Sequence, residues 1–186
     1  MAAPSIARLN AMPPDEAAAF LELLFEAAPR FIARLVRNRP FADEAELFAR
    51  AEALALRLPA DEAIELVNAH PRLGAPRASV SRLSAREQGY DGPGDGQPPT
   101  LAERLEALNR AYEDRFGFRY CVFVNGRSRE ALIPEWEERV ARGDRPAELD
   151  RARRDVVAIG RDRYRRLTGD VAERREVAGR REEATA

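Results

Sequence analysis

Residues 61–74 read Asp-Glu-Ala-Ile-Glu-Leu-Val-Asn-Ala-His-Pro-Arg-Leu-Gly, and this stretch indicates both the class of fold and the place of its chemistry. Ala63, Val67 and His70 are spaced i, i+4 and i+7, which puts them on one face of an α-helix. Asp61 is a candidate N-cap, and a residue before proline is pushed out of the α region, so the helix should end at His70. The only histidine of the chain is therefore expected at a helix end, facing the core side.

The same helical period recurs through most of the chain, and capping boxes open two of the segments, at Asp43 and Thr100. Residues 118–124 are rich in strand-forming side chains, but no second segment offers a pairing partner, so we expect an extended segment whose free backbone groups face a pocket. We predict an all-α fold, a single compact bundle of roughly seven to nine helices with one extended segment near 118–124. The main predicted helices are residues 14–28 with a restart at Pro29, 43–58, 61–70, 100–117, 128–142 with Ser128 as cap, and 146–167.

A single domain is expected from the length. The 186 residues suffice for one hydrophobic core, and no internal repeat or second boundary interrupts the helical pattern. Residues 89–99 contain four glycines and three prolines, so they form a loop of the kind that acts as a lid or is disordered. We predict one helical domain over residues 1–169 and a charged tail, 170–186, that has little to bury and frays or is disordered.

The composition excludes several classes of chemistry. The chain contains no lysine, so all 31 basic residues are arginine and Schiff-base catalysis has no amine to use. One cysteine and one histidine provide neither a disulfide nor zinc-ligand spacing, and Cys121 is expected to pack in the core. A net charge of -1 argues against nucleic-acid binding. No segment is apolar enough to span a membrane or to act as a signal peptide, so a cytoplasmic protein is expected.

Four further residues are candidates to act with His70. Ser84, Glu87 and Gln88 are spaced i, i+3 and i+4, so one helical face would present a hydroxyl, a carboxylate and an amide. The same segment matches a capping box, although the glycine-rich loop leaves room for at most about two helical turns. Arg163 lies on the apolar stripe of the last helix, where an ion pair with Glu87 is the structural alternative to ligand binding. His70 also has a structural alternative, because a lone histidine on an apolar face is more often a hydrogen-bonded core residue.

An ordered series of short motifs adds a family resemblance. The motifs are Phe25-Glu26-Ala27-Ala28-Pro29, Arg39-Pro40-Phe41, Ala69-His70-Pro71-Arg72-Leu73-Gly74, Ser84 with Glu87-Gln88, Leu108-Asn109-Arg110-Ala111-Tyr112, Phe116-Gly117-Phe118 and Asn125-Gly126-Arg127-Ser128. In this order and spacing, from about Leu9 to Leu167, the chain resembles the 2-oxo-4-hydroxy-4-carboxy-5-ureidoimidazoline (OHCU) decarboxylase family, the last enzyme of the route from urate to allantoin.

The resemblance implies an all-α decarboxylase without a cofactor, usually a homodimer, that converts OHCU to (S)-allantoin. It places the catalytic groups at His70 and Glu87, and a histidine near its ordinary pKa of about 6.5 would suit proton transfer. Backbone groups of the extended segment are expected to touch the substrate ring. The substrate-binding residues that the resemblance implies are Pro71, Ser84, Gln88, Phe118, Arg119, Tyr120, Cys121, Val122 and Arg163.

Two other interpretations stay open at this point. The same fold could act on a related ureido or imidazolone acid. Alternatively, the chain could be a helical interaction module without activity. Such a module would use the arginine-rich C-terminal helix, which has seven arginines from Arg151 to Arg166, to bind an acidic partner or nucleic acid. A pocket in which His70, Glu87 and Arg163 converge would favour the enzyme.

Overall fold

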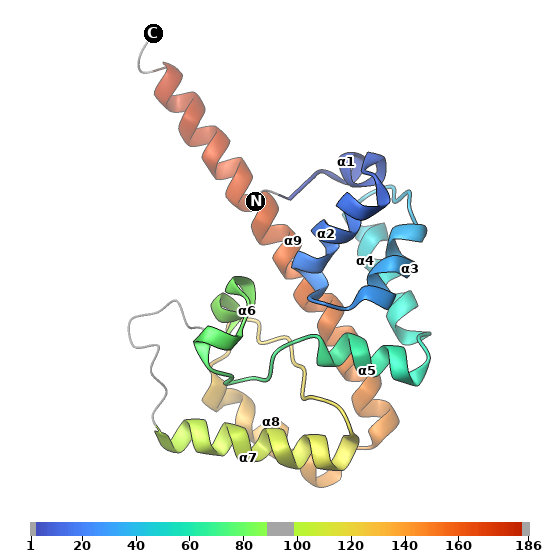
Figure 1. Cartoon of the computed structure of the whole chain (residues 1–186). Coiled ribbons are helices and arrows are strands. Elements are labelled where there is room, and N and C mark those ends of the chain that lie inside the picture. Colours follow the sequence, from blue (N-terminus) through green and yellow to red (C-terminus); the bar gives the residue numbers. More distant parts are fainter. Residues whose placement is uncertain (1–2, 89–98, 184–186) are drawn as a thin grey trace.

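The computed structural model describes residues 3–88 and 99–183 and has the predicted all-α fold (Figure 1). No β-strand occurs within these residues, and a 3-10 turn lies at Arg77–Ser79. Most of the predicted glycine-rich loop lies outside the described part of the chain. The nine helices of the described part are α1 (Ile6–Ala11), α2 (Pro14–Phe25), α3 (Pro29–Arg37), α4 (Glu44–Leu56), α5 (Ala60–Asn68), α6 (Arg82–Glu87), α7 (Pro99–Phe116), α8 (Arg129–Arg142) and α9 (Arg145–Glu183).

The long helix α9 is the element around which the others are arranged (Figure 1). It packs against α2, α4 and α5, while α3 joins these three helices to one another. At the other end of the molecule α7 packs against α8. The short helix α6 lies beside the middle of α9, between these two groups (Figure 1). Helix α9 therefore contacts the N-terminal helices α2, α4 and α5 and also α6, which carries predicted polar residues.

The buried face of α9 follows the apolar stripe read from the sequence. Gly160 lies where α9 meets α2 most closely, because a Cβ atom added there would stand 2.7 Å from Cε1 of Phe25. Phe25 is itself fully buried and packs edge-on against Phe31, with ring centroids 5.0 Å apart. Such an approach leaves no space for a side chain, which explains a glycine inside a long helix. The buried stripe residues are Leu149, Ala152, Val156 and Ile159.

The helix starts agree with most of the sequence signals. Asp43 and Ser128 act as N-caps, each accepting a hydrogen bond from a backbone N–H three residues later. The prediction of Asp61 as an N-cap is wrong, because Pro59 occupies that position and Asp61 lies in the first turn of α5. An acidic residue is also favourable there, since the helix dipole attracts it. Helix α7 begins at Pro99, one residue before the predicted capping box.

Three helix ends differ from the prediction. Helix α2 ends at Phe25 and Pro29 begins α3, so residues 14–28 do not form one continuous helix. Helix α5 ends at Asn68, two residues before His70. Helix α9 does not stop near residue 167 but continues to Glu183, beyond the predicted boundary at residue 169. The backbone of most of the predicted tail is thus helical, while the division into domain and tail stays a prediction.

The segment between α7 and α8 is extended and unpaired, as the sequence predicted. The Tyr120 ring stacks on Trp136, with centroids 4.1 Å apart and an interplanar angle of 11°. The Phe118 ring packs edge-on against Tyr112, and both are buried. These aromatic contacts fix the segment in the core, and the backbone N–H of Arg119 donates to Asn68 Oδ1 at 2.8 Å, at the end of α5.

Candidate active site

His70 lies just after α5, with its backbone N–H donating to the carbonyl of Val67 at 3.2 Å. Its side chain is buried, and neither ring nitrogen has a hydrogen-bond partner within the described part of the chain. Burial and the nearby charge of Arg163 lower the pKa of His70 from 6.5 to about 4, while the Glu26 carboxylate partly opposes this effect. The expected ordinary pKa is therefore wrong. The ring is neutral at pH 7, so one of its nitrogens carries a proton and the other can accept one, and the backbone of Leu66 also interacts with the ring.

Helix α6 brings three of the predicted residues together. Ser81 caps it, accepting a hydrogen bond from the backbone N–H of Ser84 at 3.2 Å. The interpretation of Ser84 as the cap is therefore wrong, and its buried hydroxyl faces the protein interior instead. Gln88 is also buried and binds the loop after His70, accepting from the N–H of Gly74 at 2.9 Å. This contact ties α6 to the histidine loop.

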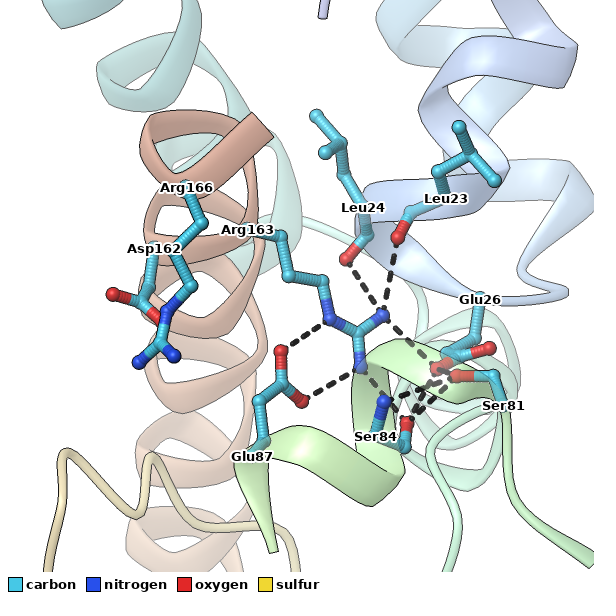
Figure 2. A network of polar contacts seen from close by, with 9 residues as sticks. All are labelled: Leu23, Leu24, Glu26, Ser81, Ser84, Glu87, Asp162, Arg163 and Arg166. Atoms are coloured by element: carbon cyan, nitrogen blue, oxygen red, sulfur yellow. Dashed lines mark hydrogen bonds and ion pairs between the residues drawn. The ribbon is translucent and has the colours of Figure 1, made fainter. Parts of the chain in front are cut away.

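The Arg163 guanidinium is fully enclosed between α2 and α6 (Figure 2). It forms a bidentate ion pair with Glu87, with Nε–Oε1 at 2.6 Å and Nη2–Oε2 at 2.8 Å. Nη2 also donates to Ser84 Oγ at 2.9 Å, and Nη1 lies 2.9 Å from Glu26 Oε1. The carbonyls of Leu23 and Leu24 each accept from Nη1 at 3.3 Å. Burial alone would lower the pKa of Arg163, but the two carboxylates raise it, so the charge is retained.

Glu26 is a member of this network that the sequence reasoning missed. Its carboxylate accepts from Ser84 Oγ at 2.6 Å and from Ser81 Oγ at 2.9 Å, in addition to its ion pair with Arg163 (Figure 2). Burial would raise the pKa of Glu26, but the Arg163 charge and the two hydroxyls lower it overall. The backbone φ of +55° is in a region that residues other than glycine seldom adopt. A strained backbone together with a paired and partly buried carboxylate, 17% exposed, indicates a constrained role for Glu26.

Beside this network lies a cavity of about 50 Å³. It is smaller than an ordinary ligand site, so a ligand must widen its mouth. Three residues of α9 that were not predicted, Ile159, Asp162 and Arg166, take part in its wall. The predicted residues in the wall are His70, Pro71, Ser84, Glu87, Gln88, Tyr120, Cys121 and Val122, and Leu73 and residues 123–126 complete it.

Three predicted substrate-binding residues do not line this cavity. Phe118 is buried in the aromatic core. The Arg119 guanidinium donates to the carbonyls of Asn68 and His70, at 2.7 and 3.1 Å, and so supports the histidine loop from behind. Arg163 is separated from the cavity by Glu87 and Ser84, with which it pairs. Whether any of the three contacts a substrate stays a prediction.

The wall formed by the extended segment is held from α9. Asp155 accepts a hydrogen bond from the backbone N–H of Phe123, and its carboxylate lies within the electrostatic influence of Arg139. Burial raises the pKa of Asp155 to about 6 in spite of these two favourable interactions. Cys121 is fully buried nearby, and burial raises the pKa of its thiol, so the thiolate that reactive cysteines use is disfavoured. The prediction that Cys121 packs in the core is confirmed.

A second hollow of about 380 Å³ lies on the far side of the histidine loop. It is larger, but its wall includes neither His70 nor Glu87, and the Arg72 side chain in it is paired with Glu113. The volume of a cavity alone therefore does not identify the active site, because catalysis requires titratable side chains that converge on one place. The smaller cavity is the candidate active site.

Within the described residues, no group of three or more histidine, cysteine or acidic side chains is placed to hold a metal ion. No helix of the described part has the length and apolarity needed to cross a membrane. The cavity instead offers a neutral imidazole, a carboxylate and an amide around a small volume, which is a set suited to orienting a polar ring and moving a proton.

The chain matches one family model and several proteins of known name. The model of the OHCU decarboxylase family matches residues 10–165. The uric acid degradation bifunctional protein PucL of Bacillus subtilis (strain 168) is 28% identical over 159 residues, which are 83% of this chain and 31% of that protein. An OHCU decarboxylase of Halalkalicoccus jeotgali is 33% identical over 105 residues, covering 56% of this chain and 58% of the relative. The chain thus spans about a third of the Bacillus relative and more than half of the Halalkalicoccus one.

Two solved structures have the same fold. A crystal structure of (S)-allantoin synthase aligns with a TM-score of 0.64 and 22% identity, over 89% of this chain and 54% of that one. A crystal structure of OHCU decarboxylase in the presence of (S)-allantoin aligns with a TM-score of 0.62 and 20% identity, over 80% of this chain and 96% of that one. The family match spans most of the chain and includes every residue of the cavity wall except Arg166. The chain belongs to the OHCU decarboxylase family.

Proposed function

We propose that the protein decarboxylates OHCU to (S)-allantoin in urate degradation, without a cofactor. The observation that carries this proposal is the meeting of His70 and Glu87 at one cavity, with Glu87 held from behind the cavity wall by the buried Arg163. An interaction module has no need of a buried cation held by two carboxylates beside a buried imidazole. The family match and the relatives named for this activity support the same reaction.

The reaction requires a place for the electron pair of the breaking bond. When carbon dioxide leaves, the pair from the C–C bond forms a ring double bond and displaces the imine electrons onto the ring nitrogen, which takes up one proton and gives an enol. The enol then loses its hydroxyl proton while the neighbouring ring carbon gains one, and allantoin results. The protein therefore has to orient the ring and manage protons, and positioned groups of this kind typically contribute about 10²- to 10⁴-fold each.

His70 is assigned the proton step, because it lines the cavity and its neutral form can accept a proton. Glu87 is held in one orientation by both of its bonds to Arg163, which leaves its remaining lone pairs for N–H groups of the ureido arm. The side chain of Gln88 and the backbone of Tyr120, Cys121 and Val122 form the rest of the surface for the ring. Protonation from one side would give a single enantiomer.

The test is to generate OHCU in situ from urate and to follow optical activity. The wild type is expected to accelerate the appearance of chiral allantoin, and His70→Ala is expected not to. Equal acceleration by the variant would remove His70 from the mechanism, and no acceleration by the wild type would exclude OHCU as the substrate. Related ureido and imidazolone acids offered in parallel would then identify the substrate.

We further propose that the protein is a cytoplasmic homodimer whose partner molecule is this small substrate and not nucleic acid or a membrane. The family resemblance supports the dimer. The net charge of -1 supports a protein that does not bind nucleic acid or a membrane surface. Light scattering coupled to gel filtration, on the full chain, measures the mass directly. A mass near 20.8 kDa, that of one chain, would exclude the dimer.

A further inference from the structure

Arg163 has little capacity left to bind a substrate. Its five N–H groups face two oxygens of Glu87, one of Glu26, Ser84 Oγ and two backbone carbonyls. The guanidinium side chain is 1% exposed and does not take part in the cavity wall. The substrate of the proposed reaction nevertheless carries a carboxylate, and an anion entering a pocket lined by acidic groups requires a cation.

Arg166 is the cation that the cavity does present. Among the described residues of the cavity wall it carries the only positive charge, because His70 is neutral at pH 7. Its Nε donates to Asp162 Oδ2 at 2.6 Å, and no other described residue pairs with its guanidinium. In Figure 2 this pair lies on the side of α9 away from the Arg163 guanidinium. The exposed fractions of the two side chains, 40% for Arg166 and 26% for Asp162, place them at the mouth.

We propose that Arg166, held by Asp162 at the mouth of the cavity, is the specificity residue that receives the substrate carboxylate, an inference that rests on the proposed decarboxylation. The carboxylate takes the two terminal nitrogens of the guanidinium, which a planar fork can offer to one anion while Nε stays on Asp162. Arg163 then acts as a positioning residue that fixes Glu87 and Ser84. The two arginines, three residues apart on one helix, have separate tasks.

The position of Arg166 suits decarboxylation for an energetic reason. The carboxylate loses its charge as carbon dioxide forms, so a strong buried ion pair would stabilise the bound substrate more than the transition state. A partly exposed arginine that is shared with Asp162 gives a weaker and salt-dependent interaction. It supplies affinity and selects for an anionic substrate without raising the barrier much. A substitution is therefore expected to change KM more than kcat.

The decisive comparison is between Arg166→Gln and Arg165→Gln. Arg165 is the adjacent arginine, is 64% exposed, pairs with Glu44 and is absent from the cavity wall, so it is a matched control. With OHCU generated in situ, Arg166→Gln is expected to raise KM roughly three- to tenfold with kcat nearly unchanged, and Arg166→Lys to restore part of the loss. Asp162→Asn is expected to lower KM, because a competing negative charge is removed. Added salt should raise the KM of the wild type and have little effect on that of Arg166→Gln.

A binding measurement keeps this inference separate from the proposed function. Allantoate is a ureido carboxylate, whereas allantoin is a neutral ring, and calorimetry can compare them. Arg166→Gln is expected to weaken allantoate binding roughly three- to tenfold and to leave allantoin binding unchanged. Turnover of OHCU by the wild type tests the proposed reaction itself. If Arg166→Gln loses the preference for allantoate over allantoin, the role of Arg166 is supported even when no turnover is seen. If Arg166→Gln behaves like Arg165→Gln in both assays, or weakens both ligands equally, the inference is wrong.

Discussion

Substitution of Glu26 by glutamine tests whether the buried network positions the active site. The change keeps the size of the side chain and removes its charge. Three interactions lose their charge assistance, namely those with Arg163, Ser81 and Ser84. A hydrogen bond to a charged group contributes about 1.5–3 kcal/mol and a neutral one about 0.5–1.5. Because Arg163 keeps both bonds to Glu87, the penalty for an orphaned buried charge does not apply in full.

The expected loss is therefore about 2–3 kcal/mol of unfolding free energy at pH 7. For a chain of this length that lowers Tm by about 5–10 °C. The pKa of Glu26 is lowered in the folded state, so its contribution is fully present above the unfolded pKa of 4.5 and is lost as the pH falls through the folded value. The difference between wild type and variant should accordingly shrink in acid. Urea denaturation at several pH values measures it.

A second readout separates positioning from stability alone. The Glu26 charge raises the pKa of His70 against the effects of burial and Arg163, so its removal should lower that pKa further. The acid side of the pH–rate profile should then move to lower pH. Glu22→Gln is the control, because Glu22 is an exposed residue of the same helix. If Glu26→Gln and Glu22→Gln differ by less than about 0.5 kcal/mol and have the same pH profile, the reasoning about the network is refuted.

Other expectations follow from individual residues. Replacing His70 with glutamine should reduce turnover by about 10²- to 10⁴-fold while circular dichroism stays unchanged; a variant within threefold of wild type would contradict its role. The folded pKa of His70 is lowered from 6.5 to about 4, so the wild type should lose up to about 3 kcal/mol of unfolding free energy as the pH falls through that window. The glutamine variant should lose less. Parallel curves of stability against pH for the two proteins would count against burial of the ring. Gly160→Ala should cost about 1–3 kcal/mol, since its Cβ would meet Phe25, whereas Gly169→Ala, which meets nothing within 4 Å, should be neutral or stabilising by calorimetry. Trp136→Ala should cost about 3–5 kcal/mol in urea, because a fully buried indole stacked on the extended segment is lost; a cost below about 1 kcal/mol would show that the segment is fixed by other contacts.

The sequence predicted correctly those elements that depend on residues within a single segment of the chain. The apolar stripe of α9 and the caps at Asp43 and Ser128 were predicted because each depends on spacing within one segment. The unpaired segment 118–124 was predicted for the opposite reason, since no partner strand exists in the pattern. The exact helix ends were less predictable. Proline at a cap and acidic residues in a first turn give overlapping signals, which is how Asp61 was misplaced.

The candidate site was only partly accessible to the same reasoning. Glu26 stands alone among apolar residues just before Pro29, and that proline was a signal that a helix ends nearby. Nothing local shows that the carboxylate turns toward an arginine 137 positions later. The pKa of His70 depends likewise on burial by distant elements. Asp162 and Arg166 resembled a solvated helix face, and only the meeting of α9 with the extended segment gives them a cavity to line.

Helix α9 divides its charge between two environments, and this bears on how readily the family can acquire new substrates. Arg163 cannot change without disturbing α2 and α6 together, because its contacts belong to both. Arg166 and Asp162 touch chiefly each other and the cavity mouth, so mutations there cost little folding stability. The molecule thus keeps a densely hydrogen-bonded interior separate from an entrance whose side chains make few other contacts. Directed evolution toward neutral or differently charged ureido compounds should begin with these two positions.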